Sequence, residues 1–147
     1  MQRSDFWHFT PFRVRYYEAD AQGILFNATY LAFFDTSITE YLRELPFDWV
    51  GERALRNTDF HVVRALVEYA APVRFDEEIE IGTKIDKLGR SSIVYKLAVF
   101  GKGESNVRST GEVVWVNADQ ATHKSAPLPG LLRERAAKKE NLEAAST

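Results

Sequence analysis

Asp20 stands a few residues before the start of a predicted helix, and this spacing could support chemistry. The first N–H groups of a helix have no partner inside it and carry the positive end of its dipole, so the backbone from Asn27 to Thr29 could polarise a carbonyl oxygen. A nearby carboxylate could then attack an acyl carbon, either directly or through a water molecule. Asp and Gly are also turn formers, so Asp20 and Gly23 alone leave open a role in the turn only.

A strand before this carboxylate and a helix after it must hold it in place. Residues 12–17 are predicted to be a strand and Gly23 marks a loop, which puts Asp20 at a strand-to-helix corner. The helix is predicted over residues 28–45, because apolar residues recur at helical spacing for about four turns. Its apolar face comprises Leu31, Phe34, Ile38, Tyr41, Leu42 and Leu45, widened by Tyr30, Ala32 and Phe33. Such a broad apolar face predicts a helix that other elements largely cover.

The rest of the chain is predicted to form mainly antiparallel strands. These strands are residues 60–69, 78–85, 93–100 and 107–117. With the first strand they make a five-stranded sheet, and only the long helix has an apolar surface broad enough to cover it, which predicts an α+β fold. Residues 50–59 are predicted to be a short helix or loop that could cover the site. Residues 127–147 are predicted to be a polar helix that frays from residue 144.

The composition excludes several classes of function. A chain of 147 residues suits one domain, over residues 1–147, and its formal net charge of −2 argues against broad nucleic-acid binding. The absence of cysteine excludes a thiol nucleophile. No apolar run approaches the roughly 18 residues of a membrane span, and no signal-peptide pattern is seen, so a cytoplasmic location is expected.

The other titratable residues are weaker candidates for a metal site or a catalytic site. His8, His61 and His123 are scattered along the chain, so no metal site is predicted, and no cofactor is expected. His61 is expected to be packed or hydrogen-bonded within its strand. Glu18, the nearest other carboxylate to Asp20, is expected on the strand, solvated or in a salt bridge.

The stretch around Asp20 resembles the hotdog-fold acyl-CoA thioesterases of the 4-hydroxybenzoyl-CoA thioesterase type. That family carries an aromatic strand, then D-x-x-G, two or three apolar residues, a short polar step and a Tyr that opens the central helix. The corresponding residues are Val14-Arg15-Tyr16-Tyr17, Asp20-Ala21-Gln22-Gly23, Ile24-Leu25-Phe26 and Asn27-Ala28-Thr29-Tyr30. The order of helix and strands extends the resemblance from about Phe9 to about Asp119.

The resemblance implies a hotdog fold, in which a five-stranded antiparallel sheet wraps around a long central helix. It also implies that Asp20 is the catalytic carboxylate, as nucleophile or general base, and that the backbone N–H of Asn27 polarises the substrate carbonyl. Many relatives have His or Tyr at the position of Asn27 and Asn at that of Thr29. The role carried over to position 27 is therefore that of the main chain.

The resemblance also suggests substrate contacts. Gly23 is expected on the substrate-binding side of the helix start. The aromatic residues Tyr30, Phe33 and Phe34 fit the core, although Tyr30, the nearest to the helix start, could contact an acyl group. On composition alone, Arg90-Ser91-Ser92 is typical of an ordinary hairpin turn. In relatives, the corresponding hairpin approaches the nucleotide of CoA, so the resemblance implies that Arg90 and Ser91 contact its phosphates. Arginine suits this role because its guanidinium binds phosphate through two hydrogen bonds.

Two classes of function stay open for such a chain. One is an acyl-CoA thioesterase that releases a free acid and CoA, and the other is a non-catalytic hotdog protein that binds acyl-CoA or an acyl-carrier protein. A hotdog dehydratase would be expected to have a His at the helix start, where this chain has Asn27, so we favour hydrolysis. A purely structural oligomer is a weaker alternative. Because a five-stranded sheet leaves edge strands unpaired, we expect a homodimer or homotetramer.

Overall fold

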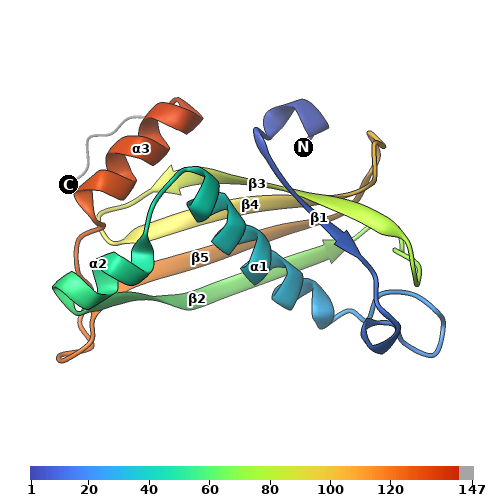
Figure 1. The fold of residues 1–147 in the computed structure, drawn as a ribbon, viewed down its shortest axis with the longest axis horizontal. Helices are drawn as coiled ribbons and strands as arrows, with labels where there is room; N and C mark the ends of the chain where they lie inside the picture. The colour runs from blue at the N-terminus through green and yellow to red at the C-terminus, as the bar shows by residue number, and fades with distance from the viewer. Residues whose placement is uncertain (143–147) are drawn as a thin grey trace.

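A computed structural model describes residues 1–142 and shows a curved antiparallel sheet with a long helix across it (Figure 1). The five strands lie in the order β1-β3-β4-β5-β2. They are β1 (His8–Arg13), β2 (Thr58–Tyr69), β3 (Glu78–Leu88), β4 (Ser92–Gly101) and β5 (Val107–Asp119), and the helices are α1 (Thr29–Glu44), α2 (Trp49–Arg56) and α3 (Gly130–Glu140). The predicted five-stranded sheet and central helix are confirmed.

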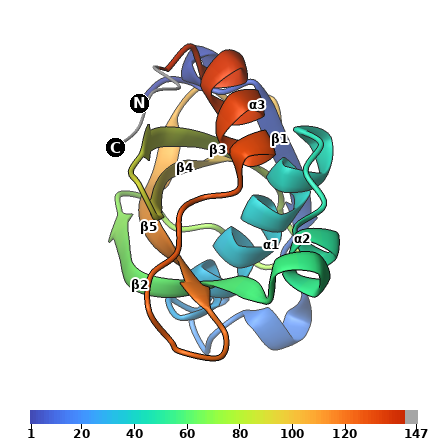
Figure 2. The same cartoon turned by 90° about the vertical axis from the view of Figure 1, so that its left-hand side faces the viewer.

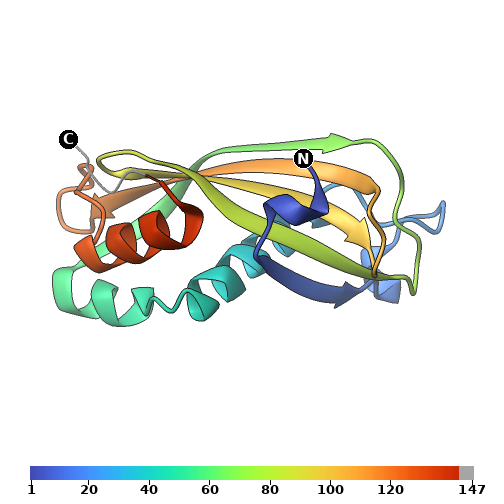
Figure 3. The same cartoon turned by 90° about the horizontal axis from the view of Figure 1, so that it is seen from above.

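Helix α1 fills the concave side of the sheet, and α2 and α3 lie on the same side (Figures 2 and 3). Its buried residues are Tyr30, Phe33, Phe34, Ser37, Ile38, Tyr41 and Leu42. The helix approaches β5 closely at Gly111, where a Cβ atom would lie 2.3 Å from Cε2 of Phe34. Only glycine leaves room for that ring.

The predicted apolar face of α1 was wrong at its first turn. Leu31 is 44% exposed, and Ala32 is exposed as well. Residues 30–34 are all apolar, so their spacing fits more than one helix face. The structure buries the face that contains Tyr30 and Phe33.

The predicted strand over residues 12–17 was placed too late in the chain, because β1 ends at Arg13. The next residues form a short 3₁₀ turn, Tyr16–Glu18, in which the carboxylate of Glu18 accepts the N–H of Arg15 at 2.7 Å. The side chains of Tyr16 and Tyr17 are 84% and 85% exposed. The alternation of aromatic residues resembles a strand, but the bond to Glu18 closes a turn there, so Glu18 is not on a strand.

The carboxylate of Glu140 fastens the end of helix α3 to the core. Oε2 of Glu140 accepts hydrogen bonds from Nε1 of Trp7 at 3.1 Å, the hydroxyl of Tyr41 at 2.6 Å and the N–H of Ile85 at 2.8 Å. Burial, together with this carboxylate, raises the pKa of Tyr41. The predicted C-terminal helix is thus present, whereas its predicted fraying from residue 144 lies outside the described residues. None of the helices within residues 1–142 is long and apolar enough to cross a membrane.

Candidate active site

Backbone hydrogen bonds hold the loop that carries Asp20. The N–H of Asp20 donates to the carbonyl of Ile24 at 2.9 Å, and the N–H of Gly23 donates to the carbonyl of Asp20 at 3.0 Å. Gly23 has a φ of 74°, a conformation that most side chains disfavour. On the other side, Leu25 donates its N–H to the carbonyl of Val73 at 2.7 Å. A short series of backbone hydrogen bonds therefore holds the Asp20 loop in place.

The carboxylate of Asp20 uses its two oxygens differently. Oδ1 accepts the N–H of Gln22 at 2.8 Å and, at 3.4 Å, that of Ile24, so Asp20 does shape its turn. Within residues 1–142, Oδ2 accepts no hydrogen bond. The turn thus orients the carboxylate and leaves one oxygen available for chemistry.

The start of α1 presents free backbone donors. The N–H of Thr29 donates to the carbonyl of Phe26 at 2.9 Å and closes the preceding turn. No side chain within residues 1–142 caps the helix at Ala28. As far as the chain is described, the N–H groups of Asn27 and Ala28 have no protein acceptor. They lie at the positive end of the helix dipole, where an anionic oxygen is stabilised.

A cleft of about 390 Å³ brings these groups together. Its lining residues are Asp20, Gln22, Ile24, Leu25, Asn27, Tyr30, Tyr69, Ala70, Ala71 and Pro72. The cleft therefore combines a carboxylate and a helix start with mostly apolar walls. Such a site suits an acyl group whose carbonyl is the only polar part.

Tyr30 belongs both to the core and to the cleft. It is 2% exposed, and its ring lies 5.0 Å from that of Tyr69, nearly perpendicular to it at 86°. Burial raises the pKa of Tyr30, although the neighbouring Ser109 hydroxyl lowers it in part. The phenol is therefore neutral at ordinary pH and acts as a wall of the cleft.

Comparison with known proteins shows the family to which this chain belongs. Residues 22–107 match the family model of the thioesterase superfamily. This chain belongs to the thioesterase superfamily. It is 34% identical to the acyl-CoA thioester hydrolase YbgC of Escherichia coli over 119 residues, which are 81% of this chain and 87% of that protein.

Solved structures agree with this assignment. The PA5185 protein of Pseudomonas aeruginosa has a TM-score of 0.83 at 32% identity, over 99% of this chain and 98% of that one. The BH1999 gentisyl-coenzyme A thioesterase has a TM-score of 0.75 at 27% identity, over 88% and 99% of the two chains. The hotdog fold and the expectation of a thioester hydrolase are thereby confirmed.

In this thioesterase, the predicted site residues fall into two groups. Asp20, Asn27 and Tyr30 line one cleft, and Gly23 shapes its loop without lining it. Arg90 and Ser91 lie in the turn between β3 and β4, at the other end of the sheet from the Asp20 loop (Figure 1). One protomer therefore does not bring them to Asp20. Helix α2 follows the far end of α1 and does not cover the Asp20 loop either.

Sequence reasoning missed the far wall of the thioesterase cleft. The carbonyl of Arg108 accepts the N–H groups of Ala70 and Ala71 at 2.9 and 2.8 Å, and its Nη1 donates to the carbonyl of Pro72 at 2.9 Å. Arg108 also pairs with Glu77 at 2.7 Å, which raises the pKa of the arginine. The sequence signal for this wall was the pair of small residues, Ala70 and Ala71, before Pro72 at the end of a predicted strand, because small side chains let neighbouring groups approach the backbone closely.

None of the three histidines lines the Asp20 cleft. Nε2 of His61 lies 3.1 Å from Nε2 of Gln120, in agreement with the hydrogen-bonded role expected for it. His8 is 3% exposed and its Nε2 lies 3.0 Å from the hydroxyl of Thr10. In the described part of the thioesterase, no three His, Asp or Glu side chains are grouped so that they could hold a metal ion.

Proposed function

We propose that this thioesterase hydrolyses acyl-CoA thioesters to a free acid and CoA, with Asp20 as the catalytic carboxylate. One observation carries the proposal: Asp20 and Asn27 line the same cleft, and within residues 1–142 one carboxylate oxygen of Asp20 and the N–H of Asn27 have no hydrogen-bond partner. The likeness to the acyl-CoA thioester hydrolase YbgC supports CoA as the carrier. The predicted cytoplasmic location and single domain stay predictions.

The chemistry follows from this arrangement. The thioester carbonyl oxygen accepts the N–H of Asn27, and its carbon faces Oδ2 of Asp20. Oδ2 either attacks the carbon, expelling the CoA thiolate and leaving an anhydride that water opens, or takes a proton from a water molecule that attacks instead. Both routes place negative charge on the carbonyl oxygen, which the donors at the helix start stabilise.

The alternative is a hotdog protein that binds acyl-CoA or an acyl-carrier protein without turnover. It is favoured by the bonds from Oδ1 of Asp20 to its own turn, which give that residue a structural reason to be present. The two functions are separated by incubating the purified protein with aromatic, short-chain and long-chain acyl-CoAs and measuring the thiol released. We expect turnover of at least one class; binding of these thioesters without thiol release would support the alternative.

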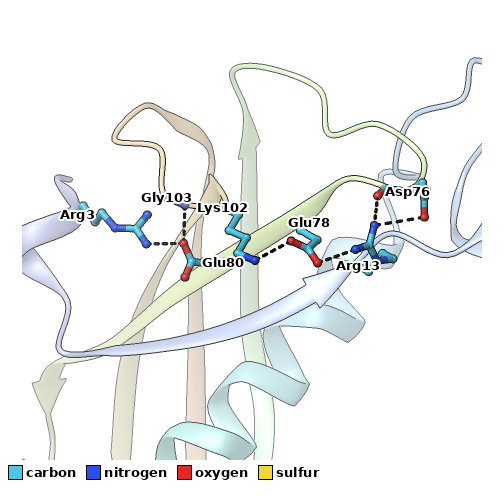
Figure 4. Close-up of polar contacts among 7 residues, drawn as sticks. All are labelled: Arg3, Arg13, Asp76, Glu78, Glu80, Lys102 and Gly103. Atoms are coloured by element: carbon cyan, nitrogen blue, oxygen red, sulfur yellow. Dashed lines mark hydrogen bonds and ion pairs between the residues drawn. The ribbon is translucent and has the colours of Figure 1, made fainter.

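The sheet has two different edges, and β1 is the protected one. It has 6 residues and contains Pro11, which has no N–H to offer to another strand. Beside β1, a row of residues with alternating charges holds the strand in place through ion pairs and hydrogen bonds (Figure 4). In this row, Arg3 and Gly103 bind Glu80, Lys102 and Arg13 bind Glu78 at 2.9 and 2.6 Å, and Arg13 also reaches Asp76 at 3.4 Å. Such an edge resists pairing.

The β2 edge is open by contrast. This strand has 12 residues, no proline, and pairs only with β5 among the described strands. Its exposed apolar side chains are Val62, Val63, Leu66 and Tyr69, which are 57%, 60%, 42% and 52% exposed. We therefore propose that β2 pairs with the β2 of a second copy, which gives the homodimer expected from the sequence or a unit of a homotetramer.

This pairing would also explain how Arg90 and Ser91 could contact CoA although they lie far from Asp20 in one protomer. If the two β2 strands are antiparallel, the Thr58 end of one copy lies near the Tyr69 end of the other, and Tyr69 lines the cleft. The turn that carries Arg90 is at the same end of its sheet as Thr58, because Thr58 pairs with Asp119 and Ser92 pairs with Val116 in β5. Arg90 and Ser91 are thus proposed to contact CoA bound to the partner's cleft.

A further inference from the structure

Tyr69, at the end of β2, makes a hydrogen bond that the proposed reaction does not yet use. Its hydroxyl donates to the carbonyl oxygen of Asn27 at 2.8 Å. The two residues are 42 positions apart in the chain, and both line the cleft. The bond joins the edge strand to the turn before α1.

Hydrogen bonds of this kind fix the orientation of the two peptide groups in that turn, Phe26–Asn27 and Asn27–Ala28. In a trans peptide the C=O and the N–H are coplanar and point in opposite directions, so fixing one fixes the other. The carbonyl of Phe26 is held by the N–H of Thr29, which orients the N–H of Asn27. The carbonyl of Asn27 is held by Tyr69, which orients the N–H of Ala28. Both oriented N–H groups are without a protein acceptor in the described chain.

The ring of Tyr69 is itself held. It stands edge-on to Tyr30, whose side chain is buried in the first turn of α1. The backbone beyond it is fixed by the bonds from Ala70 and Ala71 to the carbonyl of Arg108. The hydroxyl is therefore presented to Asn27 from a rigid support, although the side chain is 52% exposed.

We infer that Tyr69 is a positioning residue for a pair of oxyanion donors, the N–H groups of Asn27 and Ala28. The inference rests on the proposed thioester hydrolysis and adds a second donor and the group that aims it. The hydrogen bond also draws electron density toward the Asn27 carbonyl, which makes the N–H of Ala28 a stronger donor. Tyr69 does not touch the reacting carbon; it acts through the peptide between Asn27 and Ala28.

Tyr69→Phe tests this role, since it keeps the ring that walls the cleft and removes only the hydroxyl. We expect kcat to fall about tenfold, less than the ~10²–10³-fold loss that follows removal of a whole oxyanion donor, because the N–H of Ala28 remains. KM should change little, as the ring is kept. The amide signal of Ala28 in a ¹H–¹⁵N spectrum should also move, which a purely structural role would not single out.

Tyr95→Phe is the matched control. Tyr95 is fully buried in β4, its hydroxyl has no partner among the described residues, and it does not line the cleft. Removing the hydroxyl of Tyr95 should leave kcat and the amide signal of Ala28 unchanged. If the wild-type protein is active and Tyr69→Phe keeps its kcat and its Ala28 signal, the inference is wrong while the proposed function stands. If the wild-type protein hydrolyses none of the acyl-CoAs, both are wrong.

Discussion

At the scale of single residues, the two carboxylate oxygens of Asp20 have different surroundings. Oδ1 accepts two N–H groups of the turn, whereas Oδ2 accepts no hydrogen bond within residues 1–142, and Asp20 lines the cleft. The D-x-x-G spacing predicted that Asp20 would stand beside the start of the helix, and Asn27 lines the same cleft. The structure adds that the turn role and the proposed catalytic role do not compete, because they belong to different atoms.

Gly23 gives a residue-scale prediction with a matched control. Its φ is 74°, and apart from its chain neighbours no heavy atom of residues 1–142 lies within 4 Å of the position that a Cβ would take, so Gly23→Ala adds backbone strain without a clash. The strain should lower the free energy of unfolding by about 1–2 kcal/mol and, by shifting the Asp20 loop, lower kcat. Gly103 has a φ of 71° and equally open space, far along the chain in the β4–β5 turn.

Gly103→Ala should therefore lose similar stability in urea unfolding and keep its kcat. Equal kcat values for the two variants would show that the conformation of the Asp20 loop does not matter for turnover.

At the scale of elements, periodicity predicted the long helix and the sheet, and failed where local hydrogen bonds decide. The helix over residues 28–45 and the four later strands were found because their apolar residues repeat at regular spacing. The first strand was misplaced because Glu18 closes a turn within an aromatic alternation. Leu31 was misassigned because consecutive apolar residues do not define one face.

The fastening of α3 gives a prediction at this scale. Glu140→Ala leaves the hydroxyl of Tyr41 and the N–H of Ile85 without their acceptor, and each buried unsatisfied donor costs about 1–3 kcal/mol. We expect a loss of about 3 kcal/mol in urea unfolding. Glu134→Ala, at an exposed position on the same helix, should change the stability little. Equal stabilities for the two variants would contradict the fastening role of Glu140.

At the scale of the whole molecule, the cleft joins segments that are far apart in sequence. Asp20 and Asn27 come from the first quarter of the chain, whereas Tyr69 and Arg108 come from β2 and β5. Their role in the cleft depends on the antiparallel pairing of those strands, which no local pattern encodes. The sequence could therefore predict the chemical groups of the site but not its far wall.

The proposed dimer is also tested at this scale. Val63→Arg places a charge on the open edge strand, where a two-fold axis would bring the same charge from the second copy close by. Light scattering at micromolar concentration should show a dimer for the wild-type protein and a monomer for the variant. Leu131→Arg, at an exposed apolar position on α3, should stay dimeric. A wild-type monomer with full activity would rule out the dimer.

The most direct test of the proposed mechanism is the turnover number of Asp20→Asn on the best acyl-CoA of the panel. The amide keeps the shape of the carboxylate and an oxygen for the N–H of Gln22, but it can neither attack the acyl carbon effectively nor take a proton from water. Losing a general base alone costs ~10²–10⁴-fold, so kcat should fall at least that far while folding and acyl-CoA binding persist. Asn27→Ala, which keeps the backbone donor, should lose far less. Near wild-type turnover in Asp20→Asn would show that Asp20 is a turn residue only.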